Sequence, residues 1–254
     1  MISIKNSSNA SDIKRKIRES IWNLMEEKNI AKFPRPVHGR IPNFVGAEKA
    51  AKLLINCDFF DKAKVVKVNP DSPQQPVREF VLMYGKKLIM PTPRIKEGFI
   101  LLEPSNIPSK FYRDASTIKG AFKFGQKVHP KDLPKIDLIV LGSVAVSFKN
   151  GARIGKGEGY GELEYGILME YGKIDDNVTI VTTVHEVQLV EEIPVEAYDV
   201  SVDYIITPER IIKVIERHSR PKGIIWELLN GDKIKEIPLL LELKNLKNKN
   251  ILFI

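Results

Sequence analysis

The stretch ARIGKGEGYGELEY, residues 152–165, places glycine at every second position, at 155, 157, 159 and 161. Alternating glycine weakens both a helix interior and a strand interior, so it is typical of a backbone that turns tightly and approaches another group closely. Because glycine has no Cβ atom, several amide N–H groups can converge on one anion. The stretch therefore predicts a turn that binds phosphate.

The residues on both sides of these glycines support this interpretation. Residues 162–170 are good helix formers, so the turn leads into a helix N-terminus, where unpaired amides and the helix dipole attract phosphate. Arg153 and Lys156 add positive charge, and charge-assisted hydrogen bonds contribute about 1.5–3 kcal/mol each. The spacing fits neither a Walker motif, because no GKS or GKT follows, nor the dinucleotide-binding fingerprint. A flexible surface loop is the alternative.

Apolar runs around the glycine stretch predict a parallel sheet. Residues 136–146 are mainly apolar without alternation, which indicates a strand buried on both faces, or two strands that break near Gly142. Buried strands are also predicted at residues 178–184 and 203–206, with a helix to about residue 171 before them. Alternating strands and helices indicate an α/β fold, in which a turn between strand and helix is a common place for an active site.

Weaker patterns organise the rest of the chain. Ser11 can cap a helix over residues 12–28, whose isoleucines form one apolar stripe. Residues 33–46 hold three prolines and two glycines, so they are irregular and form either a cationic binding loop or a packed connector. The remaining predictions are a helix at 46–54, strands at 63–68, 79–83, 87–90 and 99–102, a turn at 69–76, partial helix at 109–122 and a helix start at 207–209.

Composition bounds the class of protein. With 254 residues and 43% hydrophobic content, the chain can bury a sizeable core. Its apolar runs are far shorter than the roughly 20 residues of a membrane span, and residues 1–11 do not resemble a signal segment, so we expect a cytoplasmic protein. The single cysteine, Cys57, excludes an intrachain disulfide. A net charge of +8 favours an anionic partner, such as a nucleotide or nucleic acid, or reflects a lysine-rich surface.

Several side chains outside the glycines are candidates for chemistry. Lys14 and Arg18 are four residues apart and share one helix face, either as anion ligands or as a solvated basic stripe. Glu162 and Glu164 follow the turn, where a carboxylate can hold magnesium or simply interact with the helix dipole. His185 follows a buried strand, and the other three histidines show no metal-ligand spacing.

These motifs together resemble a known family. The glycine motif from Arg153 to Tyr160, the basic pair in the first helix, and Asp199 and Asp203 before Thr207 resemble the 5-formyltetrahydrofolate cyclo-ligase family, also called methenyltetrahydrofolate synthetase. FPRPVHGRIPNF, MPTPR, GSVAVS, LEY, VDYIITP and RPKGI are similar to the methenyltetrahydrofolate synthetase domain-containing branch of that family. The resemblance extends from about residue 13 to 240, which suggests one domain over residues 1–254 with a short basic C-terminal tail.

The resemblance implies both a fold and a reaction. The fold would be a three-layer α/β/α arrangement with a mostly parallel central sheet. The reaction would be an ATP- and magnesium-dependent ring closure, in which ATP phosphorylates the formyl oxygen of 5-formyltetrahydrofolate, N10 attacks, and phosphate leaves to give 5,10-methenyltetrahydrofolate. Positioning and charge neutralisation dominate such transfers. The small-molecule partner would be a reduced folate or a related pterin.

The resemblance also implies roles for individual residues. Arg153 and Tyr160 would be catalytic, and Glu162 and Asp199 would hold the metal. The residues implied to bind ATP are Lys14, Arg18, Arg153, Gly155, Lys156, Gly157, Glu158, Gly159 and Tyr160.

Two departures from the family pattern leave other functions open. The usual GYYD ending is here Gly159-Tyr160-Gly161-Glu162, and the family's acid shortly before the motif is missing from residues 146–148. A non-catalytic protein that binds nucleotide or folate is therefore one alternative. An RNA-associated protein is a second, because of the net charge.

Overall fold

The computed structural model describes the backbone of residues 5–248 and the side chains of residues 10–248. Its central sheet contains β1 (Val65–Val68), β2 (Lys87–Pro91), β3 (Phe99–Leu102), β4 (Gln126–Val128), β5 (Leu138–Leu141), β8 (Thr179–Thr183), β10 (Tyr204–Ile206) and β11 (Ile211–Lys213). Across the described part of the chain their order is β11-β10-β8-β5-β1-β2-β3-β4. Strands β10, β8, β5, β1 and β2 are parallel, whereas the pairs β10–β11, β2–β3 and β3–β4 are antiparallel. The predicted α/β fold with a mostly parallel sheet is confirmed.

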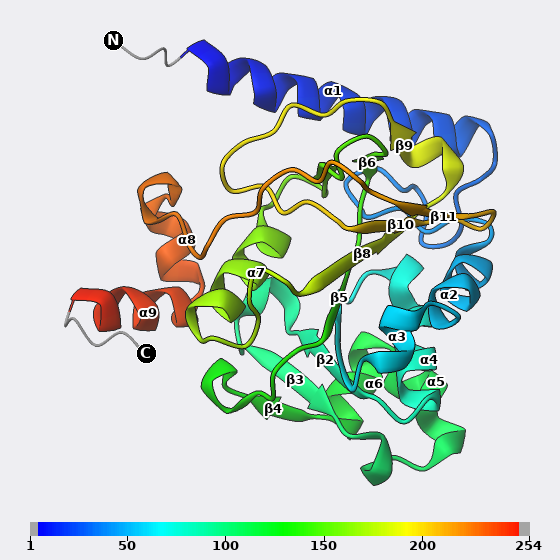
Figure 1. The fold of residues 1–254 in the computed structure, drawn as a ribbon, viewed down its shortest axis with the longest axis vertical. Helices are drawn as coiled ribbons and strands as arrows, with labels where there is room; N and C mark the ends of the chain where they lie inside the picture. The colour runs from blue at the N-terminus through cyan, green and yellow to red at the C-terminus, as the bar shows by residue number, and fades with distance from the viewer. Residues whose placement is uncertain (1–4, 249–254) are drawn as a thin grey trace.

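Helices cover both faces of this sheet (Figure 1). Helices α7, α8 and α9 lie on one side, α2 to α6 lie on the other, and α1 runs along one end. Their bounds are α1 (Lys5–Glu27), α2 (Ala47–Ile55), α3 (Asp58–Lys62), α4 (Gln75–Met83), α5 (Tyr112–Ala115), α6 (Ile118–Phe124), α7 (Tyr160–Glu170), α8 (Gly231–Glu236) and α9 (Pro238–Asn248).

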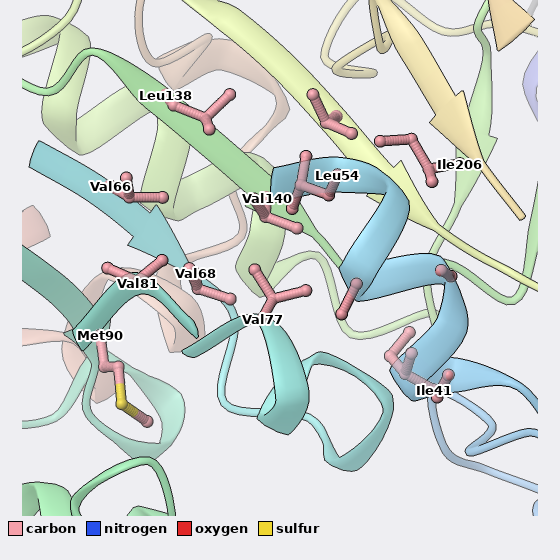
Figure 2. Packing of buried hydrophobic residues seen from close by; sticks show 14 of the residues in the cluster. Ile41, Leu54, Val66, Val68, Val77, Val81, Met90, Leu138, Val140 and Ile206 are labelled. Carbon is pink, nitrogen blue, oxygen red and sulfur yellow. The ribbon is translucent and has the colours of Figure 1, made fainter. Parts of the chain in front are cut away.

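Alternate residues of the central strands pack against the two helical layers. Val66, Val68, Leu138 and Val140 form one apolar cluster with α2 and α4, which Figure 2 shows from close by. The residues between them, such as Ile139, pack in a second cluster with α7 and α9. Since burial of apolar area contributes about 25 cal/mol per Å², these two clusters hold the three layers together.

A smaller sheet continues from the carboxyl end of β5. Within the described residues it contains β7 (Arg153–Ile154), β6 (Ala145–Ser147) and β9 (Leu189–Val190), in that order. The apolar run of residues 136–146 is thus two strands, separated at Gly142 as one of the sequence alternatives stated. The antiparallel pair β6–β7 delivers the chain to the glycine stretch.

The predicted strand at residues 79–83 is wrong, because these residues belong to α4. Val77 and Val81 lie one helical turn apart and are both fully buried. Pro76 occupies the first turn of the helix, where its missing N–H removes no hydrogen bond. The helical spacing of apolar residues begins at Val77, before the predicted strand. Residues 79–83 considered alone therefore indicate a strand rather than a helix.

The predicted helix start at residues 207–209 is also wrong. Thr207 Oγ1 accepts hydrogen bonds from the backbone N–H groups of Glu209 (3.2 Å) and Arg210 (3.0 Å), which closes a tight turn. The chain then returns as β11, antiparallel to β10. The sequence Thr-Pro-Glu is consistent with either a helix start or a turn. The turn forms because the isoleucines of β10 pair with those of β11.

The two ends of the chain also differ from expectation. Helix α1 begins at Lys5, earlier than the predicted residue 12. Residues 244–248 of the predicted basic tail belong to α9, and the rest of that tail lies outside the described residues. Among the helices that the structure describes, none combines the length and apolarity that a membrane span requires.

Candidate functional site

A cleft of about 880 Å³ opens at the carboxyl edge of the central sheet. The residues that follow β1, β2 and β5 line it, among them Asp71, Arg94 and Gly142. The chain runs from β1 to β2 in one direction along the sheet and from β5 to β8 in the other, so the strand order reverses between β1 and β5. Open α/β sheets bind ligands at such a reversal, and the cleft lies there.

The glycine stretch forms the turn along this cleft that the sequence predicts. Gly157 and Gly159 adopt φ angles of 102° and 75°, which are strained for residues that carry a Cβ atom. The turn ends at the N-terminus of α7, and residues 155–162 all line the cleft. Within the described part of the chain, no amide N–H of residues 155–162 donates to another protein atom. These N–H groups remain available to an anion in the cleft.

Arg153 lies behind the turn and is almost completely buried. Its Nη1 donates to the carbonyl oxygen of Gly142 at 2.8 Å, and its Nη2 forms an ion pair with Glu162. A Cβ atom at position 161 would lie 2.8 Å from that Nη2, so the glycine leaves room for the guanidinium group. Gly161, which stands where the resemblance leads one to expect a second tyrosine, is therefore the residue that allows Arg153 to lie this close to α7. The Nε of Arg153 is buried and has no hydrogen-bond partner in the described structure.

Helix α1 brings two cations to the other side of the turn. Arg18 Nε donates to the carbonyl oxygen of Gly155 at 2.8 Å, and burial lowers the pKa of Arg18 from its usual value. Lys14 is buried and forms ion pairs with Glu196 (2.8 Å) and Asp199 (2.6 Å). Burial raises the pKa of Asp199, against the opposing effect of Lys14. The predicted pair on one helix face is thus part of the cleft lining rather than a solvated stripe.

A buried ion pair adjoins the cleft through Glu164, which lines it, and sequence reasoning did not find this pair. Lys67 on β1 contacts Glu164 on α7, and its Nζ also donates to Asn69 Oδ1 at 3.1 Å. Only 1% of Lys67 and 4% of Glu164 is exposed, and burial raises the pKa of Glu164. Asp71 lies beside this pair, and burial raises its pKa as well. A lysine within an otherwise apolar strand was the available signal.

The outer wall of the cleft comes from residues 221–236, which we call the C-terminal segment. Eight of its residues, the first Pro221 and the last Lys233, line the cleft. Glu236 accepts a hydrogen bond from the hydroxyl of Tyr160 at 2.8 Å, and Lys233 Nζ lies 3.8 Å from the centre of the Tyr160 ring. The C-terminal segment therefore contacts the glycine turn at Tyr160, where α7 begins.

The structure brings most of the predicted site residues together. All predicted ATP ligands line the cleft, as do Glu162 and Asp199. Asp203 does not, because it binds Arg217 (3.0 Å) and Arg220 (2.6 Å) away from the cleft. His185 instead caps a short 3₁₀ helix, where its Nδ1 accepts from the N–H of Val187.

The irregular stretch at residues 33–46 contributes part of the lining. Pro34, Gly39, Arg40 and Ile41 face the cleft. Arg35 instead forms an ion pair with Glu26 of α1. The stretch therefore combines the two roles that the sequence left open.

A magnesium site is not preformed by side chains alone. Among the residues that the structure describes, no group of three or more His, Cys, Asp or Glu side chains could hold a metal ion. Glu162 and Asp199 are each paired with a cation, Arg153 and Lys14 respectively. Magnesium is commonly held by one or two carboxylates together with substrate phosphates, so these residues fit an ion that arrives with a nucleotide.

Comparison with known proteins extends over most of the chain. The model of the 5-formyltetrahydrofolate cyclo-ligase family matches residues 10–208, which confirms the resemblance seen in the sequence. The methenyltetrahydrofolate synthase domain-containing protein of Danio rerio is 40% identical over 95% of the chain and 64% of its own length. The Mus musculus protein of that name is 43% identical over 91% of the chain and 63% of its own length. The chain spans a little under two thirds of these relatives.

Two solved structures overlap with the fold. The NMR structure of Aquifex aeolicus 5,10-methenyltetrahydrofolate synthetase is 22% identical, with a TM-score of 0.49, covering 87% of this chain and 99% of its own. A 5,10-methenyltetrahydrofolate synthetase from Mycoplasma pneumoniae is 14% identical, with a TM-score of 0.47, covering 76% of this chain and 97% of its own.

Proposed function

Because the chain belongs to the 5-formyltetrahydrofolate cyclo-ligase family, we propose that it converts 5-formyltetrahydrofolate to 5,10-methenyltetrahydrofolate with ATP and magnesium. The products balance as 5,10-methenyltetrahydrofolate, ADP and phosphate, with the formyl oxygen leaving in the phosphate. ATP would supply the phosphoryl group that turns this oxygen into a leaving group, and magnesium would offset the charge of the phosphates. A related formylated pterin is the alternative substrate within the same reaction.

The free amides of the glycine turn are the observation that supports this proposal most strongly. Residues 155–162 offer N–H groups without protein acceptors at the start of α7, along the cleft. Arg18 and Lys156 lie at the same turn and supply positive charge. Backbone amides and the dipole at a helix N-terminus favour a phosphate group, and cations beside them strengthen the interaction.

The cations of the site are held by carboxylates that a nucleotide would have to replace. Lys156 forms an ion pair with Glu158 at 2.8 Å, and Lys14 is shared between Glu196 and Asp199. Triphosphate oxygens would compete for these cations, and the released carboxylates would be free to meet a magnesium ion. Glu162 and Asp199 remain our candidates for that role because both line the cleft.

Arg153 and Tyr160 remain our candidates for the residues that act during the transfer. Arg153 lines the cleft with a guanidinium group that Gly142 and Glu162 hold in place, so its positive charge would offset negative charge that accumulates beside the turn. Tyr160 keeps its hydroxyl on Glu236 and lines the cleft beside the first turn of α7. We assign Arg153 to stabilising the transferred phosphoryl group and Tyr160 to positioning the second substrate.

Turnover by the purified protein tests the proposed function. With ATP, magnesium and 5-formyltetrahydrofolate, we expect the absorbance of the methenyl product to rise together with an equal amount of phosphate. Lys156→Ala should raise the KM for ATP about ten-fold, because it removes a charge-assisted contact. Lys149→Ala is the matched control, since Lys149 is also a half-exposed lysine paired with a glutamate but lies outside the cleft. Neither product nor phosphate from the wild-type protein would refute the proposal.

A non-catalytic nucleotide-binding protein is the second candidate. The ion pair between Arg153 and Glu162 favours this candidate. Glu162 stands at the place of the acid in the GYYD ending of the family, and the ion pair engages its carboxylate. Thermal-shift titration separates the two candidates, because stabilisation by ATP and 5-formyltetrahydrofolate without turnover supports binding alone.

A further inference from the structure

The outer wall of the cleft lies beyond the part of the chain that the family model matches. That match ends at residue 208, whereas Pro221, Leu228 and Lys233 of the C-terminal segment line the cleft. The segment therefore adds contacts to the site that the matched region does not contain.

The C-terminal segment is fixed against α7. A Cβ atom at position 166 of α7 would lie 2.9 Å from Ile224 Cγ1, so the glycine allows the segment to pack closely on the helix. The N–H of Ile224 donates to Glu170 Oε1 at 3.1 Å. Beyond the segment, Leu240 and Leu243 of α9 are buried in the same apolar cluster as α7. The wall is thus held in place from both ends.

The segment presents both apolar and cationic groups to the cleft. Leu228 of the segment lines the cleft, and 58% of its surface is exposed. Ile118 of α6 lines the same cleft and is 43% exposed. Exposed apolar side chains that line a cleft are available to an apolar part of a ligand. Lys233 and Arg94 lie in the same lining.

One carboxylate serves both cations. Glu236 lies 3.4 Å from Arg94 Nη1 through Oε1 and 3.4 Å from Lys233 Nζ through Oε2, and it also accepts the Tyr160 hydroxyl. Two cations thus share one acid at this end of the cleft, which leaves a net positive charge for an anionic group of a ligand. These are long contacts, so a ligand carboxylate can compete for either cation.

This cationic pair lies apart from the groups assigned to the nucleotide. Arg18 of α1 meets the turn at Gly155, and Lys14 of the same helix pairs with Glu196 and Asp199. Lys233 of α8 instead lies over the ring of Tyr160, and Arg94, from the loop after β2, pairs with the Glu236 that also binds the Tyr160 hydroxyl. A triphosphate bound to the amides of the turn would leave the side chain of Tyr160 for the second substrate.

We propose that the C-terminal segment selects this second substrate: Leu228 contacts its aminobenzoyl ring, and Lys233 together with Arg94 binds a carboxylate of its glutamyl tail. The proposal rests on the proposed function, because it assumes that a reduced folate is the second substrate. It assigns a specificity role to residues 221–236, outside the family match.

Steady-state kinetics on two substrates tests this role. One substrate is 5-formyltetrahydrofolate, and the other is the carboxamide of 5-formyltetrahydropteroate, which keeps N10 but has neither the glutamyl residue nor any carboxylate. Lys233→Ala should raise the KM for 5-formyltetrahydrofolate about ten-fold and leave kcat and the KM for ATP unchanged, because it removes one charge-assisted contact. The same variant should not change the KM for the carboxamide, which has no carboxylate for Lys233 to bind. Leu228→Ala should raise the KM for both.

Matched variants keep the test specific. Lys235→Ala removes an exposed lysine of the same helix outside the cleft, and Leu241→Ala removes a leucine that is 49% exposed on α9. Both should behave as wild type. Equal losses on the two substrates with Lys233→Ala, or a change in the KM for ATP, would overturn the inference.

Equilibrium binding separates failure of the inference from failure of the proposed function. If the wild-type protein shows no turnover, calorimetric titration with 5-formyltetrahydrofolate and with the carboxamide of 5-formyltetrahydropteroate still measures the contribution of the glutamyl tail. The inference would be supported, and the reaction refuted, if the glutamyl compound binds more tightly to the wild-type protein and Lys233→Ala abolishes this difference in affinity. Binding of neither compound would overturn both.

Discussion

Lys67 is a buried cation in an apolar part of the central sheet, next to the site. It lies on β1 in register with Ile89 on one neighbouring strand and Ile139 on the other, both of which are buried. A charge in such surroundings is costly unless it is paired, and Glu164 supplies the pair from α7. Because Glu164 belongs to the first turns of the helix that follows the glycine turn, this contact fixes the turn to the sheet.

Breaking that pair should therefore destabilise the protein strongly. Lys67→Met should lower the free energy of unfolding by about 3–5 kcal/mol, because it leaves an uncompensated buried carboxylate. The double variant Lys67→Met/Glu164→Leu should recover most of this loss, because it removes both charges. Urea unfolding measures both values, and a double variant as unstable as the single one would contradict the assignment.

The single variant should also depend on pH in a defined direction. Burial already raises the pKa of Glu164 in the folded state, and loss of Lys67 removes an effect that lowers it. The unfolded chain releases this proton at a lower pH than the folded one, so the stability of Lys67→Met should fall as the pH rises above about 4.5. Urea unfolding of both proteins at pH 5 and pH 8 checks the sign. A loss of stability relative to wild type that is smaller at pH 8 than at pH 5 would contradict it.

Secondary structure follows from the sequence where the local pattern and the packing agree. The strands β1, β2, β3, β5, β8 and β10 and the helices α2 and α7 lie close to their predicted places, because their apolar residues match the period of the element. Prediction fails at α4 and at residues 207–210, where short apolar or polar stretches fit two elements equally well. In both cases a long-range contact, burial of Val77 and Val81 or pairing of β10 with β11, decides the outcome.

The contact between α7 and the C-terminal segment gives a prediction for these elements. Gly166→Ala should favour an isolated helix by about 1 kcal/mol, yet it places a Cβ atom 2.9 Å from Ile224 Cγ1. We expect the variant to unfold more easily than wild type and to expose the C-terminal segment to limited proteolysis. Adding Ile224→Ala removes the clashing atom and should restore protection. A single variant that is as stable and protected as wild type would show that the segment does not pack closely on α7.

At the scale of the whole molecule, the cleft joins residues that are far apart in the chain. Helix α1, the loops after β1, β2 and β5, the glycine turn and the C-terminal segment all contribute. The sequence predicts the turn and the α1 cations, because each is a local motif. Other contacts join distant parts of the chain. Lys67 and Glu164 are separated by 97 positions in the sequence, and Tyr160 and Glu236 by 76. No local sequence pattern indicates such contacts.

The central claim is that the amides of residues 155–162 bind the triphosphate of ATP at the start of α7. A crystal structure with a non-hydrolysable ATP analogue and magnesium tests it most directly. We expect phosphate oxygens within hydrogen-bonding distance of these amides and of Arg18, with Lys14 moved away from Asp199. A nucleotide bound elsewhere, with the glycine turn empty and the Lys14–Asp199 pair intact, would contradict the claim.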